Sequence, residues 1–79
     1  MVDFEWDPAK EAKNLRKHKF SFSEAATVFW DTQSMTYDGP DHSDEEDRYI
    51  IIGLSNRFRF LIVSHTERGN RIRIIRRGR

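Results

Sequence analysis

Residues 48–79 read RYIIIGLSNRFRFLIVSHTERGNRIRIIRRGR, and they contain three apolar runs separated by two short polar segments. The runs at 49–54, 58–65 and 71–76 are rich in Ile, Val and Phe, which is typical of β-strands. The segment 55–57 predicts a tight hairpin turn, and 67–70 supplies the glycine and asparagine of a second one. This part of the chain is therefore predicted to form an antiparallel meander.

Side chains of a strand alternate between its two faces, so the arginines of these runs should gather on one face of the sheet. The side chains expected on the covered face are Phe58, Phe60, Ile62, Ile72 and Ile74. Those expected on the opposite face are Arg57, Arg59, Arg71 and Arg73. Like charges on neighbouring strands repel each other, which indicates a bound anion. The alternative is that acids of residues 31–47 fold over these arginines.

The N-terminal part predicts a short strand and then a helix. Apolar residues alternate with acids over residues 2–6, which is the period of a half-buried strand. Asp7 and Pro8 are a typical N-cap and first helical residue, so a helix should run from there to about His18. Its inward side chains are expected to be Ala9, Ala12 and Leu15, and its outer face Lys10, Lys13, Arg16 and Lys17.

A second helix is predicted from the capping box of Ser21 and Glu24, in which each side chain bonds the backbone N–H of the other residue. It should end near Phe29 or Trp30. Its inward set is expected to be Phe22, Ala25, Ala26 and Phe29. Together with the strands, the two helices predict an α+β fold in which the N-terminal strand and the helices pack on one face of an antiparallel sheet.

Residues 31–47 are predicted to be mostly loop, with a short edge strand near 35–37. Within this segment, His42 lies close to Asp41 and Asp44, a pattern that resembles a weak divalent-cation site. A flexible acidic loop explains the same residues better, so no metal site and no cofactor is predicted.

Length and composition predict one small domain over residues 1–79. The chain has no cysteine, which fits a reducing compartment, and no apolar run long enough to span a membrane. Its N-terminus lacks an export signal, so the expected location is the cytoplasm. Six Phe, two Trp and two Tyr allow a small core to bury a large area.

Charge is strongly sorted along the chain, although the net charge is only +1. Residues 31–47 hold seven acids and no Lys or Arg, whereas residues 48–79 hold nine Arg and one acid. A local charge of +8 attracts polyanions, and arginine favours bidentate contacts with phosphate. A merely solubilising surface usually mixes both signs of charge, so we favour an anion-binding role.

Four segments carry motifs of a known family. They are FEWDPAK (4–10), NLRKH (14–18), FSEA (22–25) and HTERGNRIRII (65–75). In this combination and order the chain resembles the BrnT toxins of bacterial type II toxin–antitoxin systems. The resemblance implies a compact RelE-like ribonuclease fold, cleavage of RNA, and neutralisation by a small BrnA-like antitoxin with a dimeric ribbon-helix-helix domain that binds DNA.

Two features differ from the family pattern. Family members usually carry glycine after the Lys-His pair, where this chain has Lys19, and a left-handed lysine there would cost about 1 kcal/mol. Family chains also continue past the last strand into a charged helix, whereas this sequence ends in Arg76-Arg77-Gly78-Arg79. The usual C-terminal helix is therefore expected to be absent.

The sequence has no glycine-rich phosphate loop, no paired-carboxylate motif and no cluster with metal-ligand spacing, which leaves metal-independent attack by the 2′-hydroxyl of the RNA. Arg71 and Arg73 are candidates to hold the phosphate, with RNA-binding help from Arg57, Arg59, Arg76 and Lys17. His65 and Glu67 are the candidate proton carriers.

These residues also have structural interpretations. His65 could form a hydrogen bond at a strand end, and Glu67 could be a turn residue paired with Arg68. His18 is better explained as a charge at a helix C-terminus. Trp6 and Trp30 are interpreted as core residues and not as platforms for bases.

The main functional hypothesis is an endoribonuclease toxin that pairs with its antitoxin, as a 2:2 complex, and contacts DNA only through that partner. The alternative is a catalytically weak binding module that pairs with the antitoxin and acts as a co-repressor of its operon. A free-standing nucleic-acid-binding domain is less favoured, because the chain has no base-reading motif.

Overall fold

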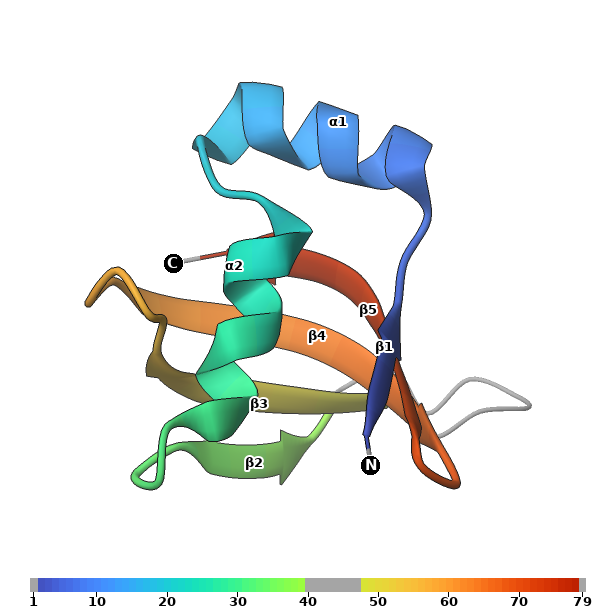
Figure 1. The fold of residues 1–79 in the computed structure, drawn as a ribbon, viewed down its shortest axis with the longest axis vertical. Helices are drawn as coiled ribbons and strands as arrows, with labels where there is room; N and C mark the ends of the chain where they lie inside the picture. Colours follow the sequence, from blue (N-terminus) through green and yellow to red (C-terminus); the bar gives the residue numbers. More distant parts are fainter. Residues whose placement is uncertain (1, 40–47, 79) are drawn as a thin grey trace.

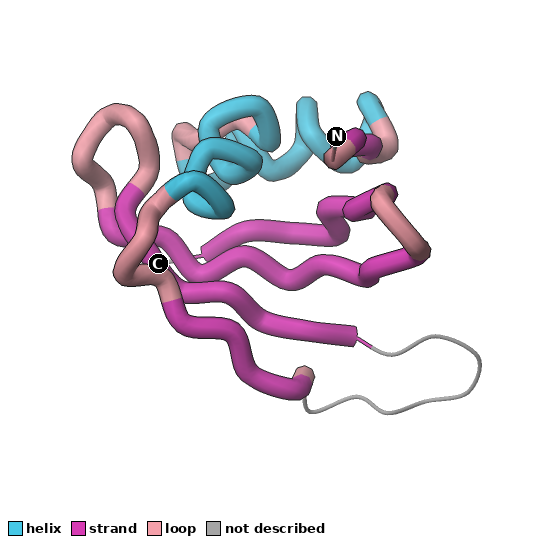
Figure 2. Tube along the Cα trace, turned by 60° about the horizontal axis from the view of Figure 1, so that its bottom comes forward, coloured by secondary structure: helices cyan, strands magenta, loops and turns pink. Residues whose placement is uncertain are grey.

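The computed structural model describes residues 2–39 and 48–78, which form a five-stranded sheet with its helices on one face (Figures 1 and 2). In chain order the elements are β1 (Asp3–Glu5), α1 (Pro8–His18), α2 (Phe22–Thr27), the 3₁₀-helix η1 (Val28–Trp30), β2 (Met35–Asp38), β3 (Arg48–Leu54), β4 (Phe60–Arg68) and β5 (Arg71–Gly78). The strand order across the sheet is β1-β5-β4-β3-β2. The α+β class is confirmed.

The predicted meander is present, because β2, β3, β4 and β5 pair antiparallel in turn. The sheet as a whole is mixed, since β1 joins its edge parallel to β5 and does not lie on its face. Phe4 is in register with Ile72, and the Asp3 N–H donates to the Asn70 carbonyl (2.9 Å). This pairing covers the first part of the β5 edge, at Arg71 to Arg73, which would otherwise be unpaired.

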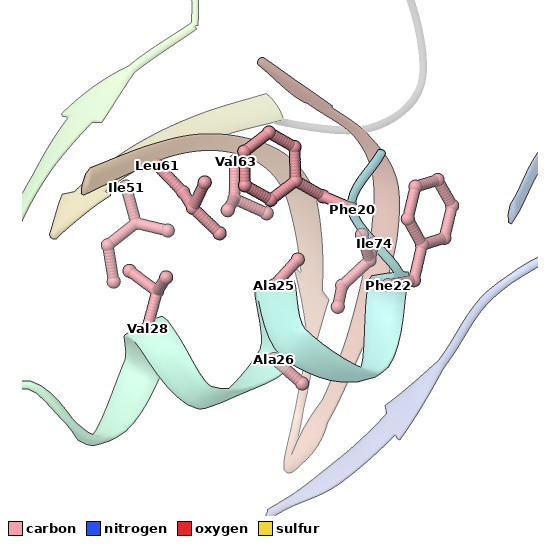
Figure 3. Packing of buried hydrophobic residues seen from close by; sticks show 9 residues of the cluster. All are labelled: Phe20, Phe22, Ala25, Ala26, Val28, Ile51, Leu61, Val63 and Ile74. Carbon is pink, nitrogen blue, oxygen red and sulfur yellow. The ribbon is translucent and has the colours of Figure 1, made fainter. Parts of the chain in front are cut away.

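The core lies between α2 with η1 and the inner face of the sheet (Figure 3). The predicted inward set of α2 is confirmed: Phe22, Ala25 and Ala26 are buried, and Phe29 packs partly buried against them. Val28, which the helical pattern did not single out, is also fully buried. From the strands the core receives Ile51, Leu61, Val63 and Ile74.

Strand β4 turns the opposite way from the prediction. Leu61, Val63 and His65 point into the core, whereas Phe60 lies on the other face of the sheet and is 62% exposed. Large apolar side chains occur at both the odd and the even positions of this strand, so alternation alone could not decide which set faces the core. The turn before it is also longer than predicted and includes Phe58, which is 86% exposed with φ +61°.

The face of the sheet away from the helices is therefore mainly apolar, and the predicted arginine lattice is wrong over most of it. We call it the open sheet face. Its described apolar residues, exposed or half-buried, include Met35, Tyr37, Ile50, Ile52, Leu54, Phe60 and Ile62. Arg71 and Arg73 of β5 are exposed on this face as predicted, and the exposed Arg48 of β3 and Arg68 of β4 lie on the same face near them by register.

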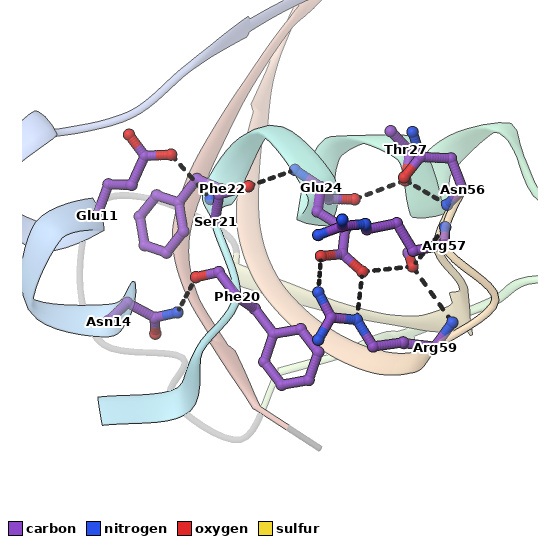
Figure 4. A network of polar contacts seen from close by, with 11 residues as sticks. Glu11, Asn14, Phe20, Ser21, Phe22, Glu24, Thr27, Asn56, Arg57 and Arg59 are labelled. Carbon is purple, nitrogen blue, oxygen red and sulfur yellow. Dashed lines mark hydrogen bonds and ion pairs between the residues drawn. The ribbon is translucent and has the colours of Figure 1, made fainter. Parts of the chain in front are cut away.

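Helix α1 has the predicted bounds and cap, since the Asp7 Oδ1 accepts from the Ala9 N–H (2.9 Å). Its predicted inward side is wrong: no residue of α1 is buried, and Leu15 is 45% exposed. Polar bonds hold the helix instead (Figure 4). Glu11 accepts from the Phe22 N–H (2.9 Å) and from Trp6 Nε1 (3.2 Å), and Asn14 Nδ2 donates to the Phe20 carbonyl (3.3 Å).

The connection between the helices confirms two local predictions and corrects a third. Lys19 adopts the left-handed conformation (φ +64°) expected of the glycine it replaces. The Ser21 Oγ accepts from the Glu24 N–H (3.0 Å), as a capping box requires. The Glu24 carboxylate does not complete the box, because it bonds Ser55 and Arg59 on the far side of the core.

Candidate functional site

The end of the β4–β5 hairpin holds the two predicted proton carriers in contact. His65 Nε2 lies 3.1 Å from Glu67 Oε2, so the pair predicted from sequence does form. The His65 side chain is fully buried, whereas that of Glu67 is 47% exposed. Only Glu67 is therefore positioned to touch a large substrate.

Aromatic rings enclose His65 from two sides. The Phe29 ring meets it edge-on with centroids 4.8 Å apart, and the Tyr49 ring stacks on it at 5.8 Å. Its second nitrogen, Nδ1, has no hydrogen-bond partner among the described residues. The ring orientation is thus fixed by packing, and its one polar contact leads to Glu67.

Arg71 and Arg73 lie at the same hairpin but on the open sheet face. Both pair with Glu5 of β1: Arg71 Nε lies 3.4 Å from Glu5 Oε1, and Arg73 Nη1 lies 3.0 Å from Glu5 Oε2. Glu67 is in register with Ile72, so these two side chains lie on the same face of the sheet. Arg71 and Arg73 flank Ile72 in β5, so their side chains point to the other face. The structure thus places the proton carriers and the phosphate-binding candidates on opposite faces of one hairpin.

Arg59 is engaged in the fold, in contrast to its predicted place on an exposed RNA-binding face (Figure 4). Its guanidinium forms an ion pair with Glu24 and lies 4.0 Å from the centroid of the Phe20 ring. The Ser55 Oγ donates to the same carboxylate (2.6 Å). Arg59 thus joins the turn before β4 to the start of α2.

The Glu24 carboxyl has a pKa below its ordinary value of 4.5. Burial on its own would raise this pKa, but hydrogen bonds from Arg59 and Ser55 and the charges of Arg59 and Arg57 lower it. The carboxylate form is therefore the one that the folded protein stabilises.

The remaining RNA-binding candidates are dispersed. Arg57 is exposed in the turn before β4, and Lys17 lies on α1. Arg76 of β5 is in register with Ser64 of β4. Its side chain is outside the part of the structure that is described. The two whose side chains are described, Arg57 and Lys17, lie in different elements.

Trp30, like Phe58 and Phe60, is exposed where the sequence interpretation expected a buried side chain. Trp30, expected in the core, is 69% exposed, while Trp6 does pack partly buried and edge-on against Phe22. Trp30 and Phe58 line a hollow of about 500 Å³ beside Leu54. Strong apolar character at a helix end does not distinguish a core position from a surface one, so no local signal could have identified Trp30.

Residues 2–39 and 48–78 contain no group of three or more His, Asp or Glu side chains able to hold a metal ion. The weak candidate formed by His42, Asp41 and Asp44 lies outside the described residues. Within the described ranges, neither helix has the length and apolar character that crossing a bilayer requires.

The family model described as "Ribonuclease toxin, BrnT, of type II toxin-antitoxin system" matches residues 6–77 of this chain. The chain belongs to the BrnT family. No curated protein matches it. The family match spans both helices, strands β2 to β4 and nearly all of β5, so it includes His65, Glu67, Arg71 and Arg73. As a BrnT member, the chain is a ribonuclease toxin. Membership of a type II toxin-antitoxin system implies an antitoxin partner.

Proposed function

We propose that this BrnT member is a metal-independent endoribonuclease that acts in the cytoplasm and uses Glu67 as its general base. The observation that carries the proposal is the contact between buried His65 and half-exposed Glu67. A carboxylate that is held by a buried histidine and is also exposed to solvent can accept a proton from a bound substrate. His65 then acts as a positioning residue, because it reaches the RNA only through Glu67.

In the proposed reaction, Glu67 takes the proton of an RNA 2′-hydroxyl, and the 2′-oxygen forms a bond to the adjacent phosphorus. The bond between phosphorus and the 5′-oxygen breaks, that oxygen takes a proton from water, and the hydroxide left behind takes the proton from Glu67, which restores the carboxylate. The products are a 2′,3′-cyclic phosphate and a 5′-hydroxyl. Arg71 and Arg73 would stabilise the charge that develops on the phosphoryl oxygens.

To bind the phosphate in this reaction, Arg71 and Arg73 must first break their ion pairs with Glu5. Their side chains are 62% and 48% exposed, and exposed ion pairs contribute only about 0–1 kcal/mol. A phosphate that accepts two bonds from a guanidinium can replace such a pair. For the arginines and Glu67 to act on one phosphodiester, the long arginine side chains must swing round the end of the hairpin from the opposite face once they leave Glu5.

The antitoxin is proposed to be BrnA-like and to cover the open sheet face. Exposed apolar patches of this kind are typical of protein interfaces, and Phe60, Met35 and Leu54 would be buried there. A ribbon-helix-helix dimer would carry one toxin on each subunit and give a 2:2 complex, so that DNA is contacted only by the antitoxin. A size measurement of the co-expressed pair tests this stoichiometry.

A second candidate function is a catalytically weak module that pairs with the antitoxin and acts as a co-repressor. The ion pairs of Glu5 with Arg71 and Arg73 favour it, because they neutralise the groups that would bind the phosphate. The two candidates differ in whether the chain is toxic on its own.

Expression of the chain with and without the neighbouring small gene tests the proposal. We expect growth arrest and RNA breakdown from the chain alone, relief when the partner is co-expressed, and no arrest from Glu67→Gln. Normal growth and intact RNA in the presence of folded wild-type chain would overturn the ribonuclease proposal in favour of the binding module.

A further inference from the structure

A groove of about 340 Å³ lies between helix α1 and strand β5, away from Glu67 and the arginines of the hairpin. Its lining residues are Lys10, Lys13, Asn14, Lys17, His18, Phe22 and Ile75. Three of these seven are lysines and none is acidic. The groove is therefore a concave, cationic surface with an apolar floor.

The orientation of α1 is the reverse of what a simple amphipathic helix would show. Lys10, Lys13 and Lys17 line the groove at spacings of three and four residues, so they share one side of the helix. Leu15 is 45% exposed on the other side. Like charges at such spacings repel one another. Lys17, in the last turn, is favoured by the helix dipole, whereas Lys10 and Lys13 are not in that turn.

No described side chain neutralises these lysines. The one acid of α1, Glu11, is occupied by the Trp6 indole and the Phe22 N–H. The ion pairs formed by the described residues join Glu24, Glu67 and Glu5 to partners outside α1. An external anion is the partner that would offset the repulsion.

We propose that this groove binds the sugar–phosphate backbone of single-stranded RNA, at a subsite separate from the cleavage site. The proposal rests on the proposed ribonuclease function, which supplies the polyanion. Lys10, Lys13 and Lys17 would contact successive phosphates, the Asn14 amide would bond a phosphate or ribose oxygen, and the half-buried Ile75 would contact the apolar side of the ribose.

The test uses fluorescence anisotropy with a short RNA that is 2′-O-methylated throughout and therefore cannot be cleaved. The groove variant is Lys13→Gln/Lys17→Gln. The matched control is Arg16→Gln/Lys19→Gln, which removes the same charge from the same end of α1 at residues outside the groove lining. Glutamine is a good helix former, and all four side chains are exposed, so both variants should fold.

We expect the groove variant to bind the probe about tenfold more weakly at physiological salt and to lower the slope of log K against log salt by about 1.4, the value for two lost phosphate contacts. The control should change affinity by no more than about twofold. Equal losses in both variants would overturn the groove proposal, because only diffuse charge would then matter. Unchanged RNA binding with weakened antitoxin binding would also overturn it and assign the groove to the protein partner.

The same probe separates this proposal from the proposed catalytic function. Glu67→Gln should bind the methylated RNA as tightly as the wild-type chain, since Glu67 does not line the groove. If wild-type chain cleaves no RNA but the groove variant still loses binding, the cleavage proposal fails and the groove proposal stands.

Discussion

His65 Nε2 lies 3.1 Å from Glu67 Oε2, and the histidine side chain is fully buried while the glutamate is 47% exposed. The two residues are separated by one position on β4, so both point to the helix side of the sheet. Phe29 and Tyr49 enclose the imidazole, and the carboxylate is the part of the pair that meets solvent. This relationship assigns the two residues different roles in the proposed reaction.

Glu67→Gln should lower kcat for RNA cleavage by about a hundredfold, because the amide cannot accept the 2′-hydroxyl proton. Its affinity for uncleavable RNA should not change. Single-turnover cleavage and anisotropy measure the two quantities separately. Asp38→Asn, which removes an exposed carboxylate from edge strand β2, is the matched control and should cleave normally. A Glu67→Gln variant with wild-type kcat would rule out its role as base.

Arg71→Ala and Arg73→Ala should each reduce cleavage by about a hundredfold, or about 3 kcal/mol of transition-state stabilisation. Neither change should unfold the domain, since both side chains are exposed and their pairs with Glu5 are superficial. Arg16→Ala on α1 is the control for loss of an exposed arginine. Wild-type activity in either folded hairpin variant would contradict phosphate binding at this position.

Local signals in the sequence predicted the elements of this fold well. The Asp7-Pro8 pair determined the start of α1, the Ser21 hydroxyl caps α2, and Gly69 has the positive φ (+59°) of the second hairpin turn. Each of these depends on residues a few positions apart, so sequence alone contains the necessary information.

Contacts between distant residues could not be predicted in the same way. Arg59 looked like a member of an exposed arginine row, but it pairs with Glu24, 35 positions earlier in the chain. Helix α1 looked amphipathic, but Glu11 and Asn14 hold it through backbone groups around Phe20 and Phe22. In both cases a polar contact between distant residues determines where the side chain or helix lies, and the local apolar pattern does not encode that contact.

Stability should depend on pH through Glu24. Its pKa in the folded protein lies below 4.5, since the bonds from Arg59 and Ser55 outweigh the effect of burial. The unfolded chain therefore binds this proton more readily, and the stabilisation is present above about pH 4.5 and is lost as pH falls through the folded pKa.

Glu24→Gln should lower the free energy of unfolding by about 2 kcal/mol at neutral pH, because it removes charge-assisted hydrogen bonds. It should also flatten the fall in stability between roughly pH 5 and pH 3. Urea unfolding across this range measures both effects, with Asp38→Asn, which removes an exposed carboxylate of β2, as a charge control. An equally steep fall in the variant would show that other carboxyls, such as Asp31, cause the dependence.

Lys19→Gly should stabilise the protein by about 0.5–1 kcal/mol, because Lys19 has φ +64° and glycine adopts this conformation without strain. For a domain of this size the gain corresponds to a rise in Tm of a few degrees, about 3–6 °C. Lys19→Ala keeps a Cβ and should give no gain, so it separates backbone strain from loss of charge. Equal Tm values for the glycine and alanine variants would contradict the strain argument.

The most direct test of the central claim is RNA cleavage by purified chain in the presence of EDTA, with the ends of the products identified by mass spectrometry. The account predicts cleavage by the wild-type chain, products with a 2′,3′-cyclic phosphate and a 5′-hydroxyl, and a loss of about a hundredfold in Glu67→Gln. Cleavage that requires a divalent cation, or that leaves a 3′-hydroxyl and a 5′-phosphate, would contradict it.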